Sequence, residues 1–339
     1  MLAHKILAAL LTVCLTAPAP LSAPNYAATR RPLRVKVGKS AKSKPQRPNA
    51  ARNAGALLWR QPAEIEGLDL FYGAGGKEGA PNPAGRFTYV SGLKKGTAKK
   101  MVVADEQERR WVVKVGPEAR TETAATRILW AAGYHVDQDY FVKRARVTGG
   151  WRGDLTDARF ERFEEALKGS RHWSWRTNPF AGSRELEGLK VLMALLNNWD
   201  LKDVNNSVFR QGRSAEPGLS VYYVSDLGAT LGSTGSFLHW LLPFTDVSAG
   251  SKGVPKDYAR QRFIDGIKRG FVDFHYKGKN PSALKGVRVE SARWMGELLG
   301  KLSDRQLSDA FRAGGYNAAE VAAYVQALRN RINQLRSLG

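Results

Sequence analysis

Three polar side chains lie close together in the middle of the chain, within residues 197–209 (NNWDLKDVNNSVF). Asp200, Lys202 and Asn205 follow the apolar, helix-patterned stretch SRELEGLKVLMALLNNW. A carboxylate can orient an attacking hydroxyl, an ammonium group can neutralise a phosphoryl group in transfer, and an amide oxygen is a ligand that suits Mg²⁺. The types and spacing of these residues therefore predict a phosphoryl-transfer site.

Further charged residues supply the other groups that phosphoryl transfer requires. Lys114 ends the strand-like run RRWVVKVG and can hold nucleotide phosphates, while Glu122, on the helix expected next, can hold that lysine. Asp226, in the motif SDLG, is a second oxygen ligand for Mg²⁺. A hairpin over residues 206–225 would bring Asp226 back beside Asn205. Each residue alone also has an ordinary structural explanation, but together they form a complete set.

These motifs resemble those of the protein-kinase-like superfamily. DLKDVN matches its D-L-K-x-x-N catalytic loop, VSDLG its D-F-G motif and WVVKVG its lysine strand. The likeness extends over roughly residues 85–335, because the order of strands, helix, catalytic loop and hairpin also agrees. It implies an α+β, bilobal protein-kinase-like fold, in which a small antiparallel β-sheet lobe carries one helix and a larger lobe is mostly helical. ATP and Mg²⁺ are the cofactors that it implies.

The resemblance also implies a role for each matching position. The glycine loop over the nucleotide would be GLKKGT, which has fewer glycines than the usual G-x-G-x-x-G. The residues with implied roles are Asp200 and Lys202 in catalysis, Lys114, Glu122, Gly92 and Gly96 in nucleotide binding, and Asn205 and Asp226 in metal binding.

The sequence departs from typical protein kinases around these motifs. Asn198 and Trp199 replace the His-Arg pair before the catalytic aspartate, and no A-P-E motif follows DLGATLG. Without that arginine, control by activation-loop phosphorylation is not expected. Only seven residues separate Lys114 from Glu122, so Glu118, one turn earlier on the same helix face, is an alternative partner. The departures resemble the atypical branches of the superfamily, such as HipA-like, secreted Golgi and phosphoinositide kinases. Transfer of AMP in place of phosphate also stays open.

The elements that must position Lys114 and Glu122 are visible as sequence patterns. The runs RFTYVSG, KKMVVADE and RRWVVKVG predict an antiparallel meander of three strands. Gly116 and Pro117 end the third strand and open a helix, which Gly133 follows. Two short strands near HVDQDYFV and RARVTG would complete a small sheet packed on that helix.

Beyond Gly150 the predicted structure is mostly helical. DARFERFEEALKG and SRELEGLKVLMALLNNW both have apolar residues at i, i+3 and i+4. NSVFR and LSVYYVSD predict the hairpin that follows the catalytic loop. Two helices end the sequence, with capping signatures at Ser303 with Gln306 and at Asn317 with Glu320.

The N-terminal segment differs from the rest of the chain. Residues 1–27 combine a basic start with the apolar run ILAALLTVCLTAPAP, which predicts a signal peptide and an exported, periplasmic or extracellular bacterial protein. No later run is apolar for long enough to span a membrane. Residues 28–62 form a basic linker that we expect to be disordered. The nucleotide-binding lobe would then cover residues 63–148 and the catalytic lobe residues 149–339.

Charge and cysteine content limit the functions that remain. The formal net charge is +22, and residues 24–62 contain ten Lys or Arg and no Asp or Glu. This basic tail is either a solvated spacer or a binding segment for an anionic envelope surface or nucleic acid. Cys14, the only cysteine, lies inside the predicted signal peptide. The mature chain would therefore have no thiol for a nucleophile, a disulfide or a metal site.

Three functions are compatible with these observations. The first is an exported kinase-like phosphotransferase that acts on a hydroxyl of a protein or a small molecule. The second is a catalytically inactive, pseudokinase-like binding module whose basic surface holds an anionic partner, because exported proteins meet little ATP. The third is an unrelated envelope protein, in which Lys114, Asp200 and Asp226 would lie far apart. Motifs of serine hydrolases, zinc proteases and Walker-type nucleotide-binding proteins are absent.

Overall fold

The computed structural model describes residues 55–93, 100–151, 153–163, 171–210, 218–234 and 250–339. The chain divides after Val37, and all described residues belong to the unit Gly38–Gly339. The predicted signal peptide and most of the predicted basic linker lie outside the described residues. The structure is α+β, as the sequence predicts.

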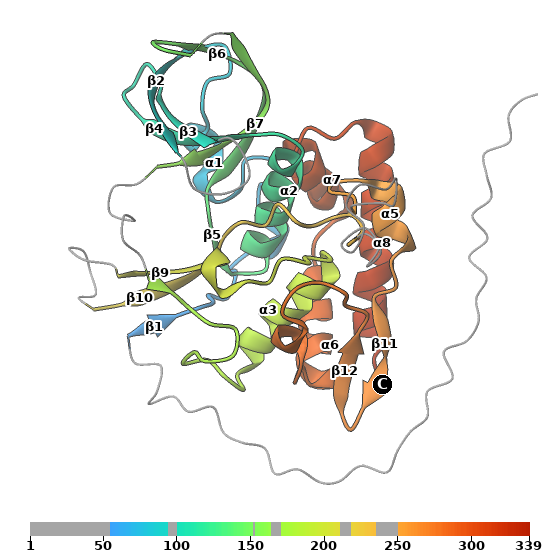
Figure 1. Ribbon diagram of the computed structural model, residues 1–339. Coiled ribbons are helices and arrows are strands. Elements are labelled where there is room, and N and C mark those ends of the chain that lie inside the picture. The colour runs from blue at the N-terminus through green and yellow to red at the C-terminus, as the bar shows by residue number, and fades with distance from the viewer. Residues whose placement is uncertain (1–54, 94–99, 152, 164–170, 211–217, 235–249) are drawn as a thin grey trace, which may run out of the picture. The chain divides into compact units, whose positions relative to one another are not determined.

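The first half of the described chain forms a closed β-barrel with the strand order β2-β3-β4-β7-β6 (Figure 1). Its neighbouring strands are antiparallel except for β2 and β6, which pair in parallel and close the barrel. The barrel is thus mainly antiparallel, as predicted, and the parallel contact of β2 with β6 is an addition that the sequence did not reveal. Closure leaves the sheet without an exposed edge. The strands are β2 (Arg86–Leu93), β3 (Lys100–Ala104), β4 (Arg110–Val115), β6 (Asp139–Thr148) and β7 (Asp154–Arg162).

Alternation along the barrel strands separates an apolar interior from a polar outer face. On β4, Trp111 and Val113 belong to the barrel core, so Lys114 points to the opposite face. On β7, Ala158 and Phe160 belong to the same core. The outer face of these strands can therefore carry charged residues that an adjacent helix covers.

Strand β7 replaces part of a predicted helix. The pattern DARFER has apolar residues at positions that fit a helix, but residues 154–162 pair with β4 on one side and β6 on the other. Two hydrogen-bonded neighbours and the burial of alternate side chains outweigh a short helical spacing. Strand β7 thus lies after the predicted lobe boundary at residue 148 but belongs to the barrel, and the boundary itself stays a prediction.

Helix α2 (Glu118–Ala131) lies against β4, β6 and β7. It begins after Gly116 and Pro117, as predicted, and its small side chains Ala124 and Ala125 are fully buried. Gly133 follows with a φ of 92°, and a Cβ there would lie 2.2 Å from the carbonyl oxygen of Arg60. Glycine is therefore required where the chain leaves the helix.

A second sheet lies next to the catalytic loop and has the order β1-β10-β9-β8, with β5 also paired to β10. The predicted hairpin corresponds to β9 and β10, which are antiparallel. Strand β1 pairs with β10 although it falls in the predicted linker, so ordered structure begins before residue 63. The strands are β1 (Ala56–Leu57), β5 (His135–Val136), β8 (Arg171–His172), β9 (Asn206–Arg210) and β10 (Ser220–Val224).

The remaining elements are mainly helices. Both predicted capping boxes are present, at Ser303 with Gln306 and at Asn317 with Glu320. The hairpin of β11 and β12 was not predicted. Within the described part of the chain, no helix has both the length and the apolar character needed to cross a membrane. The longer elements are α3 (Arg184–Leu195), α5 (Pro255–Arg260), β11 (Ile264–Lys268), β12 (Phe271–Phe274), α6 (Val289–Gly300), α7 (Asp304–Ala313) and α8 (Ala318–Arg336).

Short helical segments complete the described chain. They are η2 (Ile65–Gly67), η3 (Gly73–Gly75), α1 (Gly76–Gly79), η5 (Asp203–Asn205) and η6 (Pro281–Leu284).

Two helical glycines, one in α3 and one in α6, have different surroundings, so their replacement by alanine should change stability differently. A Cβ at Gly188 in α3 would lie 2.6 Å from Cζ3 of Trp294 and 2.7 Å from Oη of Tyr134. We expect Gly188→Ala to lower the free energy of unfolding by about 1–3 kcal/mol, because overpacking outweighs the helix propensity of alanine. A Cβ at Gly300 meets only the flexible end of Arg336, at 3.3 Å or more. Gly300→Ala should therefore be neutral or stabilising in urea denaturation, and equal losses in both variants would refute the packing argument.

The position of His135 in β5 predicts a pH-dependent stability. Burial, with a smaller contribution from Arg60, lowers the pKa of His135 to about 4. The folded state therefore favours the neutral ring, and this contribution is complete above about pH 6.5 and lost as the pH falls towards 4. We expect His135→Gln to reduce the loss of stability between pH 6.5 and 4 in urea denaturation. His172→Gln, on the exposed strand β8, is the control, and an unchanged pH slope in His135→Gln would contradict the prediction.

Candidate active site

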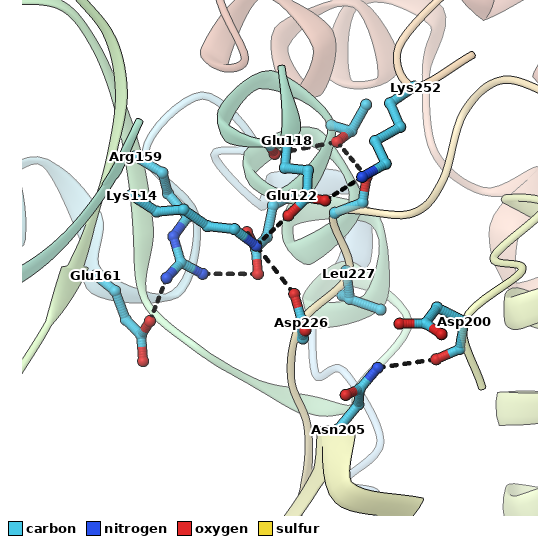
Figure 2. Close-up of polar contacts among 12 residues, drawn as sticks. Lys114, Glu118, Glu122, Arg159, Glu161, Asp200, Asn205, Asp226, Leu227 and Lys252 are labelled. Atoms are coloured by element: carbon cyan, nitrogen blue, oxygen red, sulfur yellow. Dashed lines mark hydrogen bonds and ion pairs between the residues drawn. The ribbon is translucent and has the colours of Figure 1, made fainter. Parts of the chain in front are cut away.

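Lys114 lies at the centre of the candidate site and contacts three carboxylates (Figure 2). Its Nζ atom is 2.5 Å from Oε2 of Glu118, 3.2 Å from Oε2 of Glu122 and 3.0 Å from Oδ1 of Asp226. The lysine side chain is only 3% exposed. Burial alone would lower its pKa, but Glu122, Asp226 and Glu118 outweigh burial and hold the pKa above its usual value. Lys114 is therefore a buried cation that stays charged.

Both candidate partners of Lys114 on α2 contact it, but their surroundings differ. Glu122 is buried, and its second oxygen, Oε1, forms an ion pair with Nη1 of Arg159 at 2.7 Å. Glu118 has a side chain 20% exposed and also pairs with Lys252. Burial would raise the pKa of Glu118, but Lys114 and Lys252 together hold it below its usual value. Glu122 is thus the buried partner of Lys114, and Glu118 is the partly exposed partner.

Arg159 is a buried cation that sequence reasoning missed. It lies directly across from Lys114 in the pairing of β4 with β7, on the same outer face of the barrel. Besides Glu122, its guanidinium contacts Glu161 at 2.5 Å and Asp139 at 3.3 Å. Burial raises the pKa of Asp139 to about 7 although Arg159 opposes this shift. The alternation of ARFER could have revealed Arg159 if residues 154–162 had been assigned to a strand.

The catalytic loop places Asp200 between two lysines. Its Oδ2 is 2.9 Å from Nζ of Lys202, and its Oδ1 is 3.1 Å from Nζ of Lys279. Burial would raise the pKa of Asp200, but these two lysines outweigh it and hold the pKa below its usual range. Asn198 replaces part of the usual His-Arg pair, and its Oδ1 accepts from the backbone N–H of Asp200 at 3.0 Å. Sequence reasoning found Lys202 but not Lys279.

Asn205 and Asp226 come together through the β9–β10 hairpin. The backbone N–H of Ser225, next to Asp226, donates to the carbonyl of Asn205 at 2.9 Å. The side-chain Nδ2 of Asn205 donates to the backbone carbonyl of Asp200 at 2.8 Å, which leaves its amide oxygen for other contacts. Asp226 has a φ of 51° and a side chain 42% exposed. In Figure 2 the side chain of Asn205 points to Asp200, and that of Asp226 points to Lys114.

This donor set fits Mg²⁺. One carboxylate and one amide oxygen are what Mg²⁺ takes from a protein when phosphates and water complete its octahedral shell. Burial would raise the pKa of Asp226, but Lys114 outweighs burial and lowers it, so the carboxylate is ionised and ready to bind a cation. In the described part of the chain, no cluster of three or more His, Cys, Asp or Glu forms a metal site of another kind.

Helix α8 contacts three segments that carry or adjoin residues of the candidate site. Nη1 of Arg331 in α8 donates to the carbonyl of Leu195 at 2.6 Å, at the end of the helix that carries the catalytic loop. The hydroxyl of Tyr324 donates to the carbonyl of Leu231 at 2.8 Å, shortly after the SDLG motif. Arg120 in α2 pairs with Glu320 at 2.6 Å. Helix α8 thus contacts the end of α3, the segment that follows SDLG, and α2, the helix that carries Glu122.

The glycine loop is only partly described. Gly92 lies in β2 and pairs with Met101 of β3, immediately before the loop. Gly96 lies outside the described residues. The roles predicted for both glycines, like those of the other site residues, stay predictions. In the third alternative, an unrelated envelope protein, Lys114 and Asp226 would lie far apart. Here Nζ of Lys114 is 3.0 Å from Oδ1 of Asp226.

Three solved structures that are similar to this chain, at low identity, are protein kinases. No protein-family model and no curated protein matches the chain. The Helicobacter pylori proinflammatory kinase CtkA is similar over 76% of this chain and 93% of that chain, with 9% identity and a TM-score of 0.45. The Rio2 kinase from Chaetomium thermophilum, in its ADP/Mg²⁺-phosphoaspartate complex, covers 73% of this chain and 72% of its own, with 15% identity and a TM-score of 0.30. A second Rio2 structure covers 74% of each chain, with 15% identity and a TM-score of 0.32.

The two glutamates of α2 predict different losses of stability. Glu122→Gln leaves Lys114 and Arg159 buried without their shared carboxylate, so we expect the free energy of unfolding to fall by about 3 kcal/mol or more. Glu118→Gln removes a partly exposed partner, and we expect a loss of about 1 kcal/mol or less. Chemical denaturation of both variants measures the difference. An equal or larger loss in Glu118→Gln would make Glu118 the main partner of Lys114.

Proposed function

We propose that the chain is a kinase-like phosphotransferase that moves a phosphoryl group from ATP to a hydroxyl of a protein or small-molecule acceptor. One observation carries this proposal: Nζ of Lys114 contacts both Glu122 on α2 and Asp226 beside the catalytic loop. Strand β4, the helix that follows it and a segment 112 residues further along the chain thereby meet at one buried ammonium group. An incidental surface lysine would not be enclosed in this way.

Each residue has a task in the proposed reaction. Lys114, held by Glu122, would contact the nucleotide phosphates, and Lys202 would turn from Asp200 to the transferring phosphoryl group. Asn205 and Asp226 would hold Mg²⁺, which when bound supplies positive charge against the phosphates. Asp200 would orient the acceptor hydroxyl and take its proton. The acceptor oxygen forms the new P–O bond as the bond from the γ-phosphorus to the bridging oxygen breaks, and ADP leaves.

The proposal ranks above the alternatives for specific reasons. Asp200 and Lys202 serve phosphoryl transfer but have no role in a module that only binds an anionic partner, and their ion pair is intact. Transfer of AMP would use the same residues with the nucleotide reversed, and product analysis distinguishes the two. Export of the chain stays a prediction that rests on residues 1–27 alone.

The proposal predicts a ligand-induced stabilisation that depends on Asp226. We expect MgATP at 100 times its Kd to stabilise the wild-type chain by about 2.7 kcal/mol, seen as a rise in Tm. Asp226→Ala should abolish the rise, because it removes both a metal ligand and a partner of Lys114. Asp200→Ala should keep it but lose phosphoryl transfer, which is measured as incorporation of radiolabelled γ-phosphate into the chain or an acceptor protein.

A matched control uses Asp257→Ala, at an aspartate of α5 that has no part in the proposed site. Its response to MgATP should equal that of the wild type. If MgATP fails to stabilise the wild-type chain, or stabilises Asp226→Ala equally, the chain does not use this site for nucleotide.

A further inference from the structure

A segment that the sequence did not single out reaches the catalytic aspartate. Residues 276–280 (YKGKN) follow β12 and lie along the catalytic loop. The backbone N–H of Lys279 donates to the carbonyl of Trp199 at 2.8 Å, and Lys279 forms a parallel bridge with Asp200. Its ammonium group then pairs with Oδ1 of Asp200 at 3.1 Å.

The backbone of this segment is fixed by several contacts. The hydroxyl of Tyr276 donates to the carbonyl of Lys279 at 2.7 Å. Asn280 adopts a φ of 52°, and its Nδ2 donates to the carbonyl of Leu201 at 3.1 Å. A Cβ at Gly278 would lie 2.5 Å from the Cα of Trp199, so only glycine permits this close approach. The segment is therefore docked on the catalytic loop.

The lysine side chains of the segment, by contrast, face solvent. Lys279 has a side chain 63% exposed, and Lys277 is also exposed. Among the described residues, Lys279 pairs with no carboxylate other than Asp200, and no ion pair of Lys277 occurs. Lys279 thus places one exposed cation beside the proposed base, and Lys277 adds a second exposed cation two residues earlier on the same docked segment.

The ion pair with Lys279 hinders Asp200 from acting as the proposed base. Lys202 donates a hydrogen bond to Oδ2 of Asp200, whereas Lys279 forms an ion pair with Oδ1, a buried oxygen that accepts no hydrogen bond in the described structure. Both cations lie where an acceptor hydroxyl would approach the carboxylate. Lys202 can move to the phosphoryl group in the proposed reaction. Lys279 would leave Oδ1 if its ammonium group paired with another anion. Because the lysine side chain is exposed, a bound molecule can supply that anion.

We propose that residues 276–280 recognise an acidic peptide segment of a protein acceptor, with Lys279 exchanging its ion pair with Asp200 for one with the peptide. The exchange frees Oδ1 of Asp200 for the acceptor hydroxyl. A peptide chain fits better than a small molecule because both ammonium groups are open to solvent. The inference rests on the proposed phosphotransferase function for its consequence in catalysis, but not for peptide binding.

The first test measures binding without catalysis. A fluorescent Glu-rich peptide, with alanine in place of the acceptor serine, and its Gln-for-Glu analogue are titrated with the full chain by anisotropy. We expect the Glu-rich peptide to bind more tightly, and Lys279→Gln and Lys277→Gln to weaken it by about fivefold each. Lys301→Gln, at an exposed lysine after α6, is the control and should bind as the wild type does. Equal binding of the two peptides, or unchanged binding in Lys279→Gln, overturns the proposal.

The second test measures transfer to the serine-containing peptides. We expect wild type to have a higher kcat/KM for the Glu-rich peptide, and Lys279→Gln to reduce that preference without losing the stabilisation by MgATP. A Lys279→Gln variant that keeps the full preference overturns the proposed exchange. Charge-dependent peptide binding without any transfer would refute the phosphotransferase function and keep the peptide site. Transfer without preference would keep the function and refute the peptide site.

Discussion

An ammonium group buried in the wall of a β-barrel is stable only beside negative charge, because removing it from water costs several kcal/mol. Lys114 meets this requirement with carboxylates from the first turns of α2 and from the residue that begins the DLG sequence. The barrel must therefore present β4 to α2, and the β9–β10 hairpin must return the chain to Asp226. The arrangement of these elements follows from the need to surround one cation.

Arg159 extends this network and helps it to favour a single arrangement of the strands. It stands next to Lys114 across two strands and shares Glu122 with it. Asp139 and Glu161 then balance the guanidinium, so cations and carboxylates alternate over the outer face of β4, β6 and β7. Buried polar networks of this kind favour one arrangement, because a shifted strand would leave a charge unpaired. Among the carboxylates of this network Asp226 is the most exposed, so it is the member that can respond most readily to a ligand.

The residues that sequence analysis identified share one property: each belongs to a local motif. Lys114, Asp200, Asn205 and Asp226 were found from short patterns, and the structure brings Lys114 and Asp226 together. Arg159 and Lys279 act through pairing partners more than 40 residues away. No local motif marks Lys279, and the alternation around Arg159 is informative only once residues 154–162 are assigned to a strand. The order of strands could be read from alternation, but the parallel closure of β2 on β6 could not. The stretch DARFER shows why: its spacing fits a helix or a strand, and only neighbouring strands decide.

Helix α8 contacts parts of the chain that are distant in sequence from one another. Arg331 holds the end of α3, Tyr324 holds the segment after the DLG sequence, and Glu320 pairs with α2 while capping its own helix. On the ribosome, α8 emerges after every one of these partners. The strands of the barrel pair only with one another and all precede α8 in the sequence, so the barrel can close earlier. The alignment of α2 with the loop that carries Asp200 must wait for α8. Synthesis thus delays completion of the candidate site until the other elements are already in place.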